Sequence, residues 1–135
     1  MKSRFLLLTL TSLAVSAHAG PIDYVAASNR FLSEELPKME AAVAAKDRRY
    51  FTSGLERMKT FVNDHWADLD KFPACTNAIT DFLIVGLCRI SQPGTLCEPE
   101  TFFPKFEGNL ANCRAAAKAD QGNPADASGA AELRR

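Results

Sequence analysis

The sequence predicts a small all-α domain, a bundle of four to five helices whose C-terminal helical hairpin is stapled by two disulfides. Three observations lead to this fold class. Apolar residues recur at helical spacing through most of the chain. No segment alternates with period 2 as a half-buried strand does, and no hairpin dipeptide separates two strand-like runs. Four cysteines lie in the C-terminal half, where an oxidising compartment would pair them.

The N-terminus has the three parts of a Sec-type secretory signal peptide over residues 1–19. Lys2 and Arg4 form a positive segment, an apolar run covers 5–15, and Ala17–Ala19 is a small-residue cleavage site. The alternative is a membrane anchor, but the run is shorter than the roughly 20 residues that span a bilayer. We therefore expect export to a bacterial periplasm, an oxidising compartment, and a mature chain with no membrane span.

The length of 135 residues suits one domain, which we place at 20–120. With the signal peptide removed, 14 basic residues face 16 acidic ones. A nucleic-acid partner is not expected, because binding phosphates needs a basic face. The 47% hydrophobic content is that of a folded protein rather than a disordered one.

The mature chain begins with two predicted helical segments. Helical spacing of apolar residues covers 22–36, and Pro37 predicts that this helix ends or kinks at Leu36, because proline disfavours helical geometry in the residue before it. A second segment covers 37–46.

The middle of the chain predicts two longer helices. Asp47 is placed to cap a helix over 48–66, in which Gly54 indicates the close approach of a neighbour. Pro73 suits the first turn of a helix over 74–90. Because this last helix is apolar nearly all round, we expect it at the centre of the bundle.

The last helix starts near Pro99 or Pro104 and presents one apolar face. That face consists of Phe103, Phe106, Leu110, Cys113 and Ala117. Large apolar residues nearly vanish after Asp120, so we expect a disordered tail over 121–135.

Helix geometry narrows the three ways of pairing four cysteines. Cys75 and Cys88 lie 13 residues apart, about 20 Å along one helix, whereas bonded cysteines have Cα atoms within about 7 Å. The short connection from Cys88 to Cys97 makes the two helices antiparallel neighbours. We predict Cys75–Cys113 and Cys88–Cys97, although Cys97 must wrap around the helix end. A zinc site or a dithiol redox centre is not expected, because no C-x-x-C pair exists.

Candidate chemistry centres on His65, the one histidine left after signal cleavage. It is either a general base or a structural histidine near a helix C-terminus, where its charged form interacts well with the dipole. A triad can be written from Ser53, His65 and Asp81, but no nucleophile motif supports it. We assign no catalytic residue and take His65 and Trp66 as candidate binding residues.

Haem ligation by His65 with Met39 or Met58 is the cofactor alternative. No C-x-x-C-H motif exists for covalent attachment, and we predict no cofactor.

Several carboxylates invite a functional interpretation. The pairs Glu34/Glu35 and Glu98/Glu100 are expected on the surface or in first turns of helices. Asp81 stands in the most apolar helix, and we place it at that helix's polar margin; a buried Asp81 would need Arg89, Arg114 or Lys105 as partner.

Phe102 and Phe103 are the remaining candidates. Adjacent residues on a helix cannot face the same way, so one of the two is a candidate anchor for a protein partner, while the alternative is core packing.

These observations favour binding over catalysis. We expect a periplasmic, non-enzymatic interaction protein whose partner is another protein. An immunity protein that blocks a periplasm-acting toxin is one such class, since some share the layout of a signal peptide and a small disulfide-bonded helical domain. No motif identifies a family. The alternatives are a small haem or ligand carrier and an enzyme dependent on His65.

Overall fold

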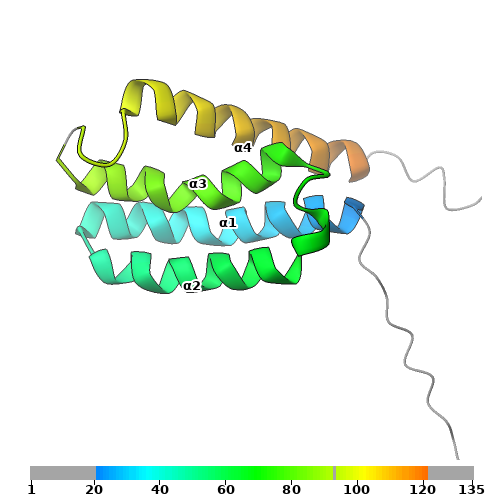
Figure 1. Cartoon of the computed structure of the whole chain (residues 1–135), viewed down its shortest axis with the longest axis horizontal. Helices are drawn as coiled ribbons and strands as arrows, with labels where there is room; N and C mark the ends of the chain where they lie inside the picture. Colours follow the sequence, from blue (N-terminus) through cyan, green and yellow to red (C-terminus); the bar gives the residue numbers. More distant parts are fainter. Residues whose placement is uncertain (1–20, 93, 122–135) are drawn as a thin grey trace, which may run out of the picture.

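Figure 1 shows the computed structural model, which describes residues 21–92 and 94–121. These residues form four α-helices, each antiparallel to the one before it. The helices are α1 (Pro21–Ala45), α2 (Arg48–Asp64), α3 (Pro73–Ile90) and α4 (Pro99–Gln121), with a 3₁₀ turn, η1 (Trp66–Asp68), between α2 and α3. The all-α prediction is confirmed. The predicted signal peptide lies outside the described residues, as does the predicted tail apart from Gln121, the last residue of α4.

The middle of the bundle is the pair α1 and α3. Each of these helices packs against the other three, while α2 and α4 lie on opposite sides of the pair (Figure 1). Eight residues of α3 are buried, which agrees with its predicted central place. The side chains that fill the interior are mostly large and apolar. They include Tyr24, Leu32, Met39, Phe51, Ile79, Phe82 and Phe106.

The helix end predicted at Leu36 is wrong, because α1 continues through Pro37. Proline removes the hydrogen bond to the Ser33 carbonyl and strains the helix. Pro37 and Ser33 both lie on the exposed side of α1. Leu32 and Met39, before and after the proline, are both buried. Packing on the two sides of Pro37 therefore holds one helix where local preference predicted two.

The turn between α1 and α2 is closed by two caps. Lys46 has a left-handed backbone, with φ of 52°. Its N–H donates to the Val43 carbonyl at 3.1 Å, and the Asp47 N–H donates to the Ala42 carbonyl at 2.9 Å. These two bonds form a Schellman motif, which ends α1. The Asp47 carboxylate accepts the Arg49 N–H at 3.0 Å, which confirms Asp47 as the N-cap of α2.

Two glycines let the helices approach closely. A Cβ atom on Gly54 would lie 2.9 Å from Leu83 Cδ2, so the predicted close approach at this position is confirmed. On Gly86 it would lie 2.6 Å from Phe51 Cε1 and 2.8 Å from Met39 Sδ. Gly86 thus faces both α1 and α2, where there is no room for a Cβ atom.

Both predicted disulfides are present. Cys75–Cys113 joins the start of α3 to the C-terminal half of α4, with Cα atoms 4.7 Å apart. Cys88–Cys97 joins the end of α3 to the segment before α4, with Cα atoms 6.0 Å apart. The hairpin is therefore closed at both ends. Two such bonds indicate an oxidising environment outside the cytoplasm.

The central helix α3 is also, within the described residues, the one helix long and apolar enough to cross a membrane by length and composition. The core helix of a packed bundle has the same properties. In this fold 44% of α3 is buried inside the protein.

Candidate functional site

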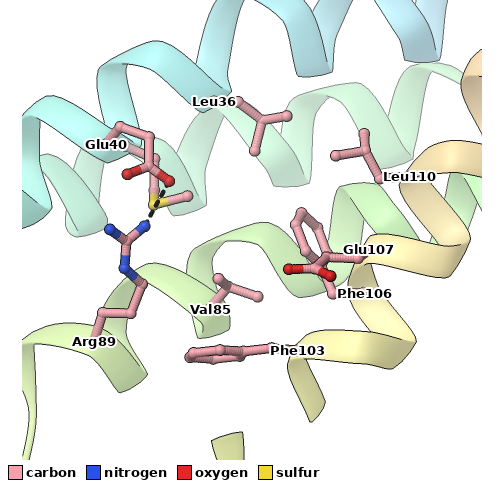
Figure 2. Close-up of a pocket in the computed structure, with 9 residues that line it drawn as sticks. Leu36, Glu40, Val85, Arg89, Phe103, Phe106, Glu107 and Leu110 are labelled. Atoms are coloured by element: carbon pink, nitrogen blue, oxygen red, sulfur yellow. Dashed lines mark hydrogen bonds and ion pairs between the residues drawn. The ribbon is translucent and has the colours of Figure 1, made fainter.

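A groove of about 420 Å³ opens on the surface between α1, α3 and α4. Figure 2 shows its lining side chains, which come from all three helices. Its floor is made of buried Met39, Val85 and Phe106. Half-buried Leu36 and Leu110 add to its walls. We call this feature the groove.

The lining follows from helix periodicity. Phe103, Phe106 and Leu110 stand at positions i, i+3 and i+7 of α4, and Leu36 and Met39 stand three residues apart on α1. Residues at these spacings share one helix face. Because α1 and α4 both pack against α3, their apolar faces meet above Val85 and Arg89.

Charged side chains surround the apolar floor. Arg89 of α3 donates from Nη1 to Oε1 of Glu40 on α1, at one edge of the groove (Figure 2). Glu107 of α4 is exposed and has no ion-pair partner among the described residues. The lining includes no hydroxyl, thiol or imidazole group. The groove is therefore suited to bury an apolar group and offers no serine, cysteine or histidine for catalysis.

Phe102 and Phe103 take different surroundings, as expected of adjacent helical residues. Both are half-buried. Both also pack against the core, but Phe103 lines the groove and Phe102 does not. Of the two candidate anchors, the structure places Phe103 at a surface a partner can reach.

His65 caps the C-terminus of α2, and its backbone N–H donates to the Phe61 carbonyl at 3.1 Å. Its ring packs against Phe61 and Tyr24, with centroid distances of 4.5 and 5.5 Å. The imidazole therefore supports an aromatic cluster at the end of α2 and does not reach the groove.

The triad written from the sequence does not assemble. Ser53 Oγ donates to the Tyr50 carbonyl at 2.9 Å. Ser53 also precedes His65 by three turns of α2, about 18 Å along the axis. Asp81 is half-buried on α3, as expected for a polar margin. Burial raises the pKa of its carboxyl, and the positive charge of Lys105 partly offsets this.

The haem alternative meets a similar difficulty. His65 contacts Tyr24, which precedes Met39 by about four turns of α1, roughly 22 Å. Met58 precedes His65 by two turns of α2, about 10 Å along the axis. Met39 therefore lies too far from His65 for the two side chains to ligate one iron, while the His65 ring that Met58 would have to join is packed against Phe61 and Tyr24. In residues 21–92 and 94–121, no three His, Cys, Asp or Glu side chains are grouped to hold a metal ion.

Trp66, the fourth candidate, is 73% exposed on η1. It follows α2 and precedes α3, whereas the groove lies near the end of α3 and the start of α4. The structure therefore separates Trp66 and Phe103 along the bundle instead of joining them in one site.

The burial of Glu35 was not predicted from the sequence. Glu34 is exposed as expected, as are Glu98 and Glu100. The surface position expected for Glu35 is wrong, since this residue is 2% exposed. The available signal was its place three residues after Leu32 and four before Met39, on the apolar face of α1.

Hydrogen bonds compensate the burial of Glu35. Its Oε1 accepts from Lys38 and Arg57, both at 2.9 Å, and its Oε2 accepts from Arg57 at 2.7 Å and Tyr50 at 2.9 Å. Burial alone would raise the pKa of Glu35, but these bonds outweigh it and lower the pKa from 4.5 to about 2. Burial and the neighbouring Glu35 carboxylate raise the pKa of Tyr50. Glu35 thus stays ionised and ties α1 to α2.

Comparison with known proteins identifies no relative. No protein-family model matches the chain, and no curated protein or solved structure matches it.

Proposed function

We propose that this chain is an exported, non-enzymatic binding protein of the periplasm, and that the groove holds apolar side chains of a partner protein. The observation that carries this proposal is the groove itself, with its buried floor of Met39, Val85 and Phe106 open to the surface. Burial of accessible apolar surface by a partner stabilises the complex by about 25 cal/mol for each Å² removed from water.

The surroundings of the groove favour a protein as the occupant. Protein interfaces commonly have an apolar centre and a polar rim. Here the rim consists of the Glu40–Arg89 pair and Glu107. The Glu107 carboxylate, which has no ion-pair partner in residues 21–92 and 94–121, would complement a Lys or Arg beside the apolar residues of the partner.

An inhibitor or immunity role fits the same features. A binder that acts by covering another protein's site needs a preformed surface and no catalytic groups, and rigidity lowers the entropy cost of binding. Two disulfides hold α3 and α4, which supply six of the groove's nine lining residues. The signal-like N-terminus and the disulfides support action outside the cytoplasm.

A carrier of a small apolar ligand is the second candidate. The groove's volume of about 420 Å³ falls within the roughly 300–1,000 Å³ of ligand pockets. Mass spectrometry of solvent extracts from the oxidised, purified protein distinguishes the two functions. A stoichiometric apolar compound would favour the carrier, and its absence together with a protein complex would favour the interaction protein.

Photo-cross-linking tests the protein-binding function. A benzoylphenylalanine replaces Glu107 at the groove rim, and a control chain has it at exposed Thr52 on α2. Both proteins are exposed to the extracytoplasmic fraction of the source cells, and cross-linked species are identified by mass spectrometry. We expect one partner that is cross-linked from position 107 and not from position 52. This partner, once purified, should bind the unmodified protein. Equal labelling from both positions, or no binding by the purified partner, would refute the proposal. A toxin as the partner would specify the immunity role.

A further inference from the structure

A second surface lies around Trp66, at the end of the bundle where α2 passes into α3. A shallow depression of about 390 Å³ is lined there by Trp66, Ala67, Leu69 and Asp70. Asp64, the last residue of α2, is also exposed next to this turn. We call these five residues the Trp66 corner.

The exposure of Trp66 occurs on a turn that is held in place. The Asp68 N–H donates to the His65 carbonyl at 2.9 Å, and the Lys71 N–H donates to the Asp68 carbonyl at 3.1 Å. The Leu69 carbonyl accepts the Thr76 hydroxyl of α3 at 2.6 Å. Because its supporting backbone is bonded on both sides, the indole is displayed to solvent by an ordered segment.

Acidic side chains outnumber basic ones at and beside the Trp66 corner. Asp68 is largely buried and forms an ion pair with Lys71, so these two charges compensate each other. Asp64 and Asp70 are exposed, and neither has an ion-pair partner within the part of the chain that the structure describes. Two carboxylates with no ion-pair partner among the described residues therefore stand on either side of Trp66 in the sequence, and Asp70 lines the same depression as the indole. Trp66 is the most exposed large apolar side chain in that part of the chain.

We propose that the Trp66 corner binds an arginine-bearing basic segment of a partner protein. A guanidinium stacks on the face of an indole through cation–π attraction, and its fork of N–H donors pairs with carboxylates. Trp66 would supply the ring, and Asp64 and Asp70 the charge. Tryptophan is also among the residues that most often dominate binding energy at interfaces. The corner and the groove share no residue, so this inference does not rest on the function of the groove.

The test uses the fluorescence of the corner itself, since Trp66 is the one tryptophan of the chain. The full oxidised protein is excited at a wavelength that selects tryptophan and titrated with a ten-residue peptide of alternating arginine and alanine. A second peptide has glutamate in place of arginine. We expect a saturable change in emission with the arginine peptide only, weakened by added salt.

Variants identify the groups responsible. The double variant Asp64→Asn/Asp70→Asn should weaken binding of the arginine peptide about 5-fold at low salt. The matched control Glu98→Gln/Glu100→Gln, which removes two exposed carboxylates outside both surfaces, should leave it unchanged. Trp66→Leu, followed by calorimetry, should weaken it about 10-fold or more. Leu110→Asp in the groove should have no effect on this peptide, so failure of the corner and failure of the groove are separable.

Three results would overturn the inference. The first is an equal response to both peptides, and the second is an affinity that the double variant leaves unchanged. The third is a shift of Trp66 emission when residues 122–135 are deleted with no peptide present, which would make the chain's own Arg134 and Arg135 the occupants.

Discussion

Glu35 of α1 and Arg57 of α2 are joined by two parallel hydrogen bonds, from Nε to Oε1 at 2.9 Å and from Nη2 to Oε2 at 2.7 Å. The carboxylate is buried, while the Arg57 side chain is 40% exposed and its guanidinium carbon lies 5.4 Å from the centroid of the Tyr50 ring. Tyr50 also donates its hydroxyl to Glu35. Since α2 otherwise contributes few buried side chains, this cluster is a main attachment of α2 to the bundle.

Glu35→Gln should lower the free energy of unfolding by about 2–3 kcal/mol at pH 7. The amide cannot compensate Arg57 and Lys38, although the partial exposure of Arg57 limits the loss. Urea unfolding gives the measurement, and Glu34→Gln on the exposed neighbouring position is the control, with an expected change below about 0.5 kcal/mol. Equal effects of the two substitutions would contradict the assigned role.

The effect of Glu35 should depend on pH in a defined direction. Its pKa is lowered from 4.5 to about 2 on folding, so its stabilisation is complete above about pH 4.5 and is lost as the pH falls toward 2. The difference in unfolding free energy between the wild type and Glu35→Gln should therefore be constant from pH 5 to 7 and should shrink below pH 4.5. A difference that stays constant down to pH 2 would show that the carboxylate's charge is not responsible.

The glycines of α3 and α4 should respond oppositely to alanine. Gly86→Ala places a methyl group against Phe51 and Met39, so we expect a loss of about 1–3 kcal/mol despite the better helix propensity. Gly108→Ala meets no atom within 4 Å and should gain about 0.5–1 kcal/mol. Denaturant midpoints of both variants test the packing of α3 against α1 and α2. A change in stability of the same sign in both variants would contradict this packing.

Lys46→Gly should stabilise the protein by about 1 kcal/mol. Lys46 ends α1 in the left-handed region, where glycine avoids the clash of a Cβ atom. Ala44→Gly, within the last turn of the same helix, is the control and should destabilise by up to about 1 kcal/mol. Thermal unfolding of the two variants gives the comparison, and a loss of stability in Lys46→Gly would argue against the Schellman motif.

The two disulfides should contribute unequally. Cys75–Cys113 closes a loop of 38 residues and Cys88–Cys97 one of 9. On the loop-entropy model, replacing each pair by alanine costs about 4 and about 2.6 kcal/mol. Because the loops are nested, removing both bonds should cost less than the sum. The free energy of unfolding of the three variants, measured without reductant, tests this order. A larger loss on removing Cys88–Cys97 than on removing Cys75–Cys113 would contradict it.

The elements that local sequence determines were predictable. Asp47 caps α2 through a contact two residues away, and the helical periodicity of α3 needs no information from other elements. The cysteine pairing followed from the length of α3 and the short connection after it. Pro37 was misleading because the buried residues around it hold α1 together through packing against other helices.

The candidate site was only partly predictable, because its residues come from distant parts of the chain. Phe103 was a candidate from its own neighbourhood, but Leu36 and Val85 reach the groove only through the way that α1 and α4 pack on α3. The role of Glu35 likewise depends on Arg57, 22 residues away on another helix. The periodicity of one segment shows which of its faces is apolar, but it does not specify which faces of two helices pack together.

The measurement that tests the central claim most directly is the affinity of the partner cross-linked at position 107 for two variants of α4. Leu110→Asp puts a charge into the wall of the groove, whereas Ala111→Asp adds the same charge at the adjacent exposed position. Both oxidised proteins are first shown to be folded by circular dichroism, and binding is then measured by calorimetry. Binding through the groove predicts that the affinity falls about 10-fold or more for Leu110→Asp and changes by less than about 2-fold for Ala111→Asp. Equal affinities of the two folded variants would contradict binding through the groove.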